Sequence, residues 1–227
     1  MHLADSIYAF VQARMSSCRF PGKVLASFRG QALITHVLAA VERVLPPGHI
    51  VVATSDDASD DLLASHLREG GVNVFRGPLE NVFERFRLCA LEYPCEWILR
   101  VNADSPLLDA HVLQAVIDHP ERADCDLVTT IFPRTFPNGH NAEVIRVSTF
   151  LALDRGRLSS EDKEHLTRFY YRNPDLFRIV NVESGNPRLA ESSLAVDTVD
   201  DLHRLEQLTD EEIHSFSYGG LSSKKVG

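Results

Sequence analysis

The stretch IYAFVQARMSSCRFPGK, residues 7–23, joins an apolar pentapeptide to a basic loop, and it decides how the rest of the sequence is interpreted. Residues 7–11 form a continuous apolar run, which is typical of a central strand covered on both faces. Residues 12–23, called the basic loop below, carry Arg14, Arg19 and Lys23 among small residues and one glycine. A basic loop directly after a buried strand predicts an anion site at the carboxyl edge of a parallel sheet.

Strand and helix patterns alternate along the first half of the chain. Short apolar runs at residues 50–53, 72–75 and 97–101 predict further strands. Between and after them, apolar residues recur at helical spacing in four segments, which lie at about residues 33–44, 59–67, 79–86 and 108–117. Ser59 is the expected cap of the second helix. Repeated βαβ units predict an α/β protein, a Rossmann-like three-layer sandwich with a mostly parallel central sheet.

The second half is less regular but continues the same domain. Strands are expected at residues 126–131, 143–147 and 177–182, with a short strand end at 194–197. Helices are expected at residues 148–155, 160–171 and 199–208. No linker divides the chain, so we expect one domain over residues 1–218 and a disordered tail over 219–227.

Composition excludes several classes of partner. The chain has 32 acidic and 23 basic residues and a net charge of −9, so we expect no general binding to nucleic acid or to anionic membrane. Neither a signal peptide nor a membrane span is expected, because no long apolar run occurs. Four isolated cysteines predict free thiols, a cytoplasmic location and no structural metal cage; they are Cys18, Cys89, Cys95 and Cys125.

The three cations of the basic loop can converge on a polyphosphate together with backbone N–H groups. The alternative is a solvated basic loop. The loop is not a Walker motif, because Gly22 and Lys23 are followed by Val24 rather than by serine or threonine, and it lacks the G-x-G-x-x-G spacing. An acidic protein that concentrates cations at a strand end favours the phosphate interpretation.

Asp104 follows a predicted strand and suits a divalent cation. It comes just after residues 97–101 and before Pro106, where a carboxylate can hold a hard cation against phosphate oxygens. Asp197 ends the segment 194–197, before a helix that Thr198 could cap. The alternative is helix N-capping, which is equally ordinary for Asp109 and also conceivable for Asp104, Asp197 or Thr198.

These motifs together resemble a known family. The basic loop resembles the pattern Q-A-R-x-x-S-x-R-x-P-G-K of cytidylyltransferases of the spore coat polysaccharide biosynthesis protein F family, which are similar to acylneuraminate and 3-deoxy-manno-octulosonate cytidylyltransferases. Further matching motifs lie in the family's order at residues 100–109, 138–144, 164–167 and 196–202. The matching loop residues are Gln12, Ala13, Arg14, Ser17, Arg19, Pro21, Gly22 and Lys23. The resemblance implies the glycosyltransferase A type fold over a single nucleotidyltransferase domain.

The resemblance also implies a role for each site residue. Arg14, Arg19 and Lys23 would be catalytic, and Asp104 and Asp197 would hold Mg²⁺. The nucleotide would contact Gln12, Ala13, Arg14, Ser17, Arg19, Lys23, Thr54, Asp56, Asn102 and Asp104. The acceptor would contact Asn141, Glu143 and His165. Asn141 departs from the family, which usually has aspartate there, and residues 138–144 can also be a plain turn leading into a strand.

The activity implied is transfer of CMP from CTP to a sugar acid or related hydroxylated acceptor, with release of pyrophosphate, in polysaccharide or cell-surface glycan biosynthesis. One alternative is a nucleotide-sugar glycosyltransferase of the same fold, although its D-x-D motif is replaced here by Asn102-Ala103-Asp104. Another is a nucleotide-binding protein that has lost catalysis. The resemblance further implies a homodimer through the second half, where five aromatic residues are either interface or core: Phe132, Phe136, Phe150, Phe169 and Tyr170.

Overall fold

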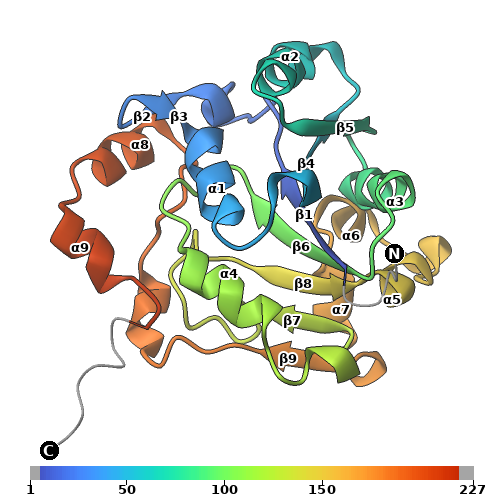
Figure 1. Cartoon of the computed structure of the whole chain (residues 1–227). Helices are drawn as coiled ribbons and strands as arrows, with labels where there is room; N and C mark the ends of the chain where they lie inside the picture. The colour runs from blue at the N-terminus through green and yellow to red at the C-terminus, as the bar shows by residue number, and fades with distance from the viewer. Residues whose placement is uncertain (1–5, 220–227) are drawn as a thin grey trace, which may run out of the picture.

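The computed structural model describes residues 6–219, and a seven-stranded sheet runs through its centre (Figure 1). In sheet order the strands are β5 (Asn73–Gly77), β4 (Ile50–Ser55), β1 (Ile7–Gln12), β6 (Trp97–Asn102), β8 (Glu143–Arg146), β7 (Leu127–Thr129) and β9 (Ile179–Asn181). Strands β5, β4, β1 and β6 are parallel, and β8 is antiparallel to both β6 and β7. The predicted mostly parallel sheet is therefore confirmed.

Strand β1 lies inside the sheet, between β4 and β6, because its side chains are apolar on both faces. Val11 and Phe10 are fully buried and belong to the two different core clusters that cover opposite faces. In the register of the sheet, Gln12 lies between Ala53 of β4 and Asn102 of β6. The carboxyl ends of three strands thus meet where the basic loop begins.

Helices cover both faces of the sheet, as predicted. Helices α1 (Leu33–Glu42), α2 (Asp61–Glu69) and α4 (Ala110–Ile117) contribute to the core on one face (Figure 1). Helices α3 (Val82–Glu92), α5 (Val147–Leu151), α6 (Ser160–Glu164) and α7 (Arg168–Arg172) lie on the side of the other cluster. Their buried aliphatic and aromatic stripes supply the main driving force for folding.

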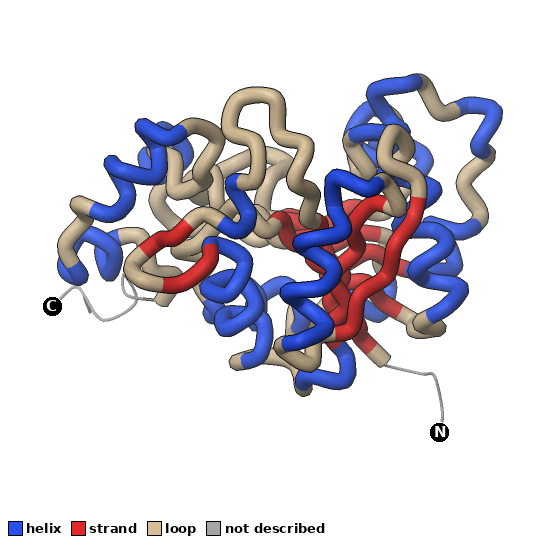
Figure 2. The backbone as a smooth tube through the Cα atoms, turned by 90° about the horizontal axis from the view of Figure 1, so that it is seen from above, coloured by secondary structure: helices blue, strands red, loops and turns tan. Residues whose placement is uncertain are grey.

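A third, smaller core lies beside the main sheet. Figure 2 shows the β2 (Ser27–Phe28) and β3 (Gln31–Ala32) ribbon standing apart from it. Helix α8 (Val199–Glu206) joins this third core, whose buried members are Phe28, Leu33, Leu194, Val196, Leu202 and Leu205. Helix α9 (Asp210–Ser215) follows it. This core ties the residues just before Asp197 to the segment that follows the basic loop.

Three local expectations are wrong. Ser59 does not cap α2: its N–H donates to Asp57 in the turn Ala58–Asp60. Residues 194–197 form no strand, and only an isolated bridge joins Ser193 to Asn138. The helix expected over residues 160–171 is two helices, because buried Leu166 lies in a break between them.

The aromatic residues of the second half are mostly core. Phe136, Phe150, Phe169 and Tyr170 are buried, whereas Phe132 is 37% exposed. Within residues 6–219, no helix is both long enough and apolar enough to cross a membrane. The expected tail at residues 219–227 lies outside the described part of the chain except for Gly219.

Candidate active site

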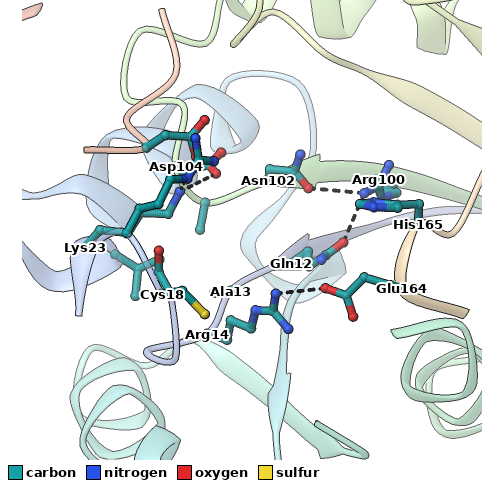
Figure 3. A pocket seen from close by; sticks show the side chains of 15 residues that line it. Gln12, Ala13, Arg14, Cys18, Lys23, Arg100, Asn102, Asp104, Glu164 and His165 are labelled. Atoms are coloured by element: carbon teal, nitrogen blue, oxygen red, sulfur yellow. Dashed lines mark hydrogen bonds and ion pairs between the residues drawn. The ribbon is translucent and has the colours of Figure 1, made fainter. Parts of the chain in front are cut away.

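A cavity of about 400 Å³ opens at the carboxyl ends of β1 and β6 (Figure 3). Its wall is built from the basic loop, the end of β6, the break between α6 and α7, and the residue before the cap of α8. The lining residues are Gln12, Ala13, Arg14, Ser17, Cys18, Arg19, Lys23, Val24, Arg100, Asn102, Ala103, Asp104, Glu164, His165 and Asp197. Most of the nucleotide- and metal-binding residues expected from the sequence are brought together here, from segments up to 185 positions apart (Gln12 to Asp197).

The basic loop folds around the peptide groups of Met15. The carbonyl oxygen of Met15 accepts hydrogen bonds from the N–H groups of Ser17 at 2.9 Å and Gly22 at 2.8 Å. Gly22 has φ +74°, a left-handed conformation that favours glycine. These bonds close the loop into a compact turn, so Arg14, Arg19 and Lys23 all reach the same cavity.

Lys23 connects the two predicted metal-binding aspartates. Its Nζ donates to Asp104 Oδ2 at 2.8 Å, to Asp197 Oδ1 at 3.0 Å and to the carbonyl oxygen of Val196 at 2.8 Å. The side chain of Lys23 is only 10% exposed. A guanidinium nitrogen of Arg19 also lies 2.9 Å from Asp197 Oδ1. Two carboxylates and a carbonyl therefore converge on one cationic position.

Local capping explains why the Asp197 carboxylate faces the cavity. Thr198, not Asp197, is the N-cap of α8, in a capping box with Asp201. The backbone N–H of Asp197 donates to Asp201 Oδ2 at 3.1 Å. Burial opposes ionisation of Asp201, but the hydrogen bonds from Thr198 and Asp197 hold its pKa below the usual range. Asp109 is likewise a plain N-cap, of α4.

A second set of polar contacts lies on the other side of the cavity. Arg100 donates to Gln12 Oε1 at 3.1 Å and to Asn102 Oδ1 at 3.4 Å (Figure 3). It also pairs with the Glu143 carboxylate. Tyr171 donates its hydroxyl to the same carboxylate. Burial and the Glu143 charge raise the pKa of Tyr171 well above its ordinary value, so the phenol remains a donor.

Arg14 completes the ring of ion pairs around the cavity. Its guanidinium lies 2.8 Å from Glu164 Oε1, and both side chains are about one-third exposed, at 34% and 31%. His165 lines the cavity next to Glu164. Both residues lie where the chain leaves α6, so the break that the sequence pattern does not predict is what presents them to the cavity.

Four expected site residues do not line the cavity. Thr54 is fully buried and donates to Asp60, while Asp56 is exposed to solvent. Asn141 contacts Arg134 and Asn138. Glu143 pairs with Arg100, which lines the cavity, but Glu143 itself does not reach the cavity wall.

Sequence reasoning assigned no role to three residues that the structure places at or near the site. Arg100 and Glu164 belong to motifs that match the family. Arg100 lies near the end of a predicted strand and Glu164 directly precedes His165, so their charge and position could have indicated a place in the site. Asp60 has no such signal, because it is one of four aspartates in SDDASDD, residues 55–61. Only the fold distinguishes this buried carboxylate from its exposed neighbours.

The donor chemistry of the site fits a hard divalent cation. Carboxylate and carbonyl oxygens are the ligands that Mg²⁺ prefers, and it usually keeps waters and substrate phosphates as its other ligands. Within residues 6–219, no cluster of three or more His, Cys, Asp or Glu side chains could enclose a metal. The pair of Asp104 and Asp197 therefore suits a metal shared with a phosphate rather than a closed structural site.

Comparisons with known proteins identify the family of the chain. A family model described as Cytidylyltransferase matches residues 8–218. The spore coat polysaccharide biosynthesis protein SpsF of Bacillus subtilis (strain 168) is 28% identical over 210 residues, which cover 90% of this chain and 86% of that protein. A 3-deoxy-manno-octulosonate cytidylyltransferase of Anaeromyxobacter dehalogenans (strain 2CP-1) is 30% identical over 146 residues, which cover 63% of this chain and 58% of that enzyme.

Solved structures share the fold. A cytidylyltransferase from Leptospira borgpetersenii serovar Hardjo-bovis matches with a TM-score of 0.84 and 26% identity, over 95% of this chain and 92% of that one. A CMP:2-keto-3-deoxy-manno-octonic acid synthetase complexed with CTP matches with a TM-score of 0.67 over 91% of this chain and 99% of that one. At 16% identity, the second similarity extends to the fold alone.

Proposed function

Because the chain belongs to the cytidylyltransferase family, we propose that this nucleotidyltransferase transfers the cytidylyl group of CTP to a hydroxylated acceptor and releases pyrophosphate. The observation that carries the proposal is the convergence of Lys23, Asp104 and Asp197 at the open edge of the sheet. That arrangement supplies cations for the phosphates and carboxylates for a metal within one cavity.

The three cations of the basic loop are the proposed phosphate ligands. In the free protein each of them is paired with a carboxylate: Arg14 with Glu164, Arg19 with Asp197, and Lys23 with Asp104 and Asp197. A triphosphate offers stronger acceptors to the same guanidinium and ammonium groups. Binding would therefore exchange intramolecular pairs for pairs with the β and γ phosphates.

Asp104 and Asp197 are the residues that would hold Mg²⁺, together with the carbonyl oxygen of Val196. When bound, the ion would neutralise charge on the phosphate oxygens. Lys23 already sits between these oxygens, so its ammonium is the group that would lose its carboxylate partners and turn toward the phosphates.

The chemistry needs no nucleophilic side chain. The hydroxyl oxygen of the acceptor forms a bond to the α-phosphorus and releases its proton to solvent, while the bond from that phosphorus to the leaving pyrophosphate breaks. The task of the protein is therefore positioning and charge neutralisation. Arg19 and Lys23 would stabilise the charge that develops on the leaving pyrophosphate.

A sugar acid or a related hydroxylated compound is the proposed acceptor, and glycan biosynthesis is the proposed context. The names of the relatives, a spore coat polysaccharide biosynthesis protein and 3-deoxy-manno-octulosonate cytidylyltransferases, support both. His165 and Arg100 would contact the acceptor from the cavity wall, with Glu143 acting through Arg100. Asn141 would act indirectly, by holding Arg134. A homodimer and a cytoplasmic location stay predictions.

Pyrophosphate release tests the proposal. The purified protein is incubated with Mg²⁺, one of the four nucleoside triphosphates and one member of a panel of sugar acids, neutral sugars and phosphonates. We expect release with CTP that depends on one acceptor class, and loss of release in Lys23→Ala but not in Lys163→Ala. Equal release from all four triphosphates, or none with CTP across the panel, would contradict the proposal.

A further inference from the structure

We propose that Asp60 is a positioning residue for nucleotide binding, because its buried carboxylate clamps the basic loop to the end of β4. The inference rests on the proposed function, since it assigns the clamp a consequence for CTP affinity. Asp60 lies outside the cavity, at the end of the turn Ala58–Asp60 that precedes α2. It acts through Met15, which belongs to the basic loop.

The carboxylate of Asp60 is fully buried and accepts four hydrogen bonds. Oδ1 accepts from the backbone N–H of Met15 at 2.6 Å. Oδ2 accepts from the Thr54 hydroxyl at 2.9 Å, from the Ser55 N–H at 2.9 Å and from the Ser55 hydroxyl. Among residues 6–219, no lysine or arginine forms an ion pair with it. One side chain thus joins the loop after β1 to the end of β4.

Local structure does not explain this buried charge. Aspartates before helices usually cap them, but the Asp60 side chain makes no capping bond to α2. Asp57 caps the preceding turn instead. A buried carboxylate is expensive to desolvate, and its hydrogen bonds must offset that penalty. All of these bonds go to β4 and to the basic loop, and none to the helix that Asp60 precedes.

The hydrogen bond from Met15 to Asp60 anchors the residue around which the basic loop turns. The N–H of Met15 is held by Asp60, while its carbonyl oxygen holds the N–H groups of Ser17 and Gly22. Arg14 precedes this anchored residue, and Lys23 follows the closing glycine directly. Releasing the N–H frees the turn that presents these cations, so more ordering entropy must be lost when phosphate binds.

The same contact gives Thr54 a role different from the one its motif implies. Its hydroxyl faces Asp60 inside the protein rather than the cavity. Thr54→Val removes one of four donors and keeps the Met15 contact, so it is expected to weaken the clamp less than Asp60→Asn. In Asp60→Asn one of the two oxygens becomes an amide N–H₂ group, which cannot accept a hydrogen bond. Either the bond from Met15 or the bonds from β4 are therefore lost, depending on which side that group faces.

The test uses Cys18, which is exposed and lines the cavity, as a reporter of nucleotide binding without turnover. Its alkylation rate is measured in the full-length protein at increasing CTP concentration with Mg²⁺. Asp60→Asn is compared with Asp61→Asn, which removes the same charge one residue later from a side chain that is 63% exposed. KM for CTP, kcat and the melting temperature are measured in parallel.

Asp60→Asn is expected to raise the half-protecting CTP concentration and KM by about tenfold or more, the range for losing a hydrogen bond to a charged group, with a smaller change in kcat. Thr54→Val is expected to raise both by about threefold, and Asp61→Asn to leave them unchanged. Equal protection in folded Asp60→Asn and Asp61→Asn overturns the clamp. If Asp60→Asn does not fold, an unchanged Thr54→Val overturns it.

The outcome separates this inference from the proposed function. If CTP protects Cys18 in no variant, the wild type included, the proposed function fails. The clamp is then judged by the alkylation rate without nucleotide, which must be faster in Asp60→Asn than in Asp61→Asn because the loop is released. Equal rates overturn the clamp in that case as well.

Discussion

Two sets of carboxylates lie close together at the carboxyl edge of the sheet, and they are held in opposite ways. Asp104, Asp197 and Glu164 face the cavity, with side chains that are 25%, 33% and 31% exposed, and their partners are the cations of the basic loop. Asp60 and Glu143 are buried, with Glu143 only 3% exposed, and their partners are fixed. The first set lines the cavity, and the second set is paired inside the protein.

The difference in exposure determines what each set can do. Partly exposed ion pairs such as Arg14–Glu164 and Arg19–Asp197 contribute little to stability, so a triphosphate can replace them at small cost. Lys23 is only 10% exposed, but it has three acceptors and keeps two of them when one carboxylate is removed. Removing one partner of a buried pair leaves an uncompensated charge, which is strongly destabilising. We therefore expect substitutions in the cavity set to lower activity with little effect on folding, and substitutions in the buried set to reduce stability or loop order.

The largest expected effect comes from the cavity set. Asp104→Asn should lower turnover about 1,000-fold, corresponding to roughly 4 kcal/mol of transition-state stabilisation, because it removes a carboxylate that is proposed to hold the metal. Its melting temperature should stay near that of the wild type. Steady-state pyrophosphate release and thermal denaturation measure the two quantities. Asp118→Asn, on the exposed end of α4, is the matched control, and full activity in Asp104→Asn would contradict the metal assignment.

The buried set should show the reverse pattern. Glu143→Gln leaves the Arg100 guanidinium without its anionic partner, so we expect the free energy of unfolding to fall by about 3 kcal/mol. Urea denaturation monitored at the single tryptophan, Trp97, measures this change. Glu183→Gln, at an exposed position, should change it by less than about 0.5 kcal/mol. If the Glu143→Gln protein is as stable as the control, the expected difference in stability between the buried set and the cavity set is contradicted.

Arg19 offers a smaller test of the cavity set. Its side chain is 66% exposed, so Arg19→Gln should leave stability nearly unchanged. The loss of one phosphate contact should lower kcat/KM for CTP by about 30-fold, or roughly 2 kcal/mol. Arg43→Gln, exposed at the end of α1, is the control. An equal effect of the two substitutions would argue against a phosphate contact at Arg19.

The smallest expected effect concerns pH and a buried neutral side chain. Burial lowers the pKa of His140; its Nε2 donates to the Leu107 carbonyl oxygen at 2.9 Å, while its buried Nδ1 has no partner in the described chain. The unfolded chain therefore binds an extra proton as pH falls through about 6.5, and stability contributed by the neutral ring is present above that pH and lost below it.

The measurement is the unfolding free energy at pH 7.5 and at pH 5.5. We expect the wild type to lose about 1 kcal/mol more than His140→Gln over this interval. His214→Gln, at an exposed position in α9, should lose as much as the wild type. The same pH dependence in all three proteins would show that His140 is not the group responsible.

Much of this architecture is predictable from the sequence, and the reasons are physical. The alternation of apolar runs and helical stripes fixes the parallel half of the sheet, because the strands β4, β1 and β6 are apolar and mostly buried on both faces. Parallel strands place their carboxyl ends at one edge. That is why Lys23 and Asp104 could be assigned to one site although they are distant in sequence, whereas Asp197 follows no strand and is assigned through the family resemblance.

The features of the site that the sequence does not predict depend on tertiary contacts. The break between α6 and α7 brings Glu164 and His165 to the cavity, yet the sequence there reads as one helix because its apolar residues keep helical spacing. Thr54 follows the apolar run at residues 50–53, as a ligand would, but it lies within β4 and its hydroxyl is turned to Asp60 inside the protein. Which of four neighbouring aspartates is buried depends on packing against the basic loop, and no local pattern encodes it.

A crystal structure with CTP and Mn²⁺ tests the central claim most directly, because anomalous scattering locates the metal independently of the protein atoms. We predict an anomalous peak between the carboxylates of Asp104 and Asp197, with the β and γ phosphates in contact with Arg14, Arg19 and Lys23. A nucleotide bound outside this cavity, or a metal peak away from both carboxylates, would contradict the account.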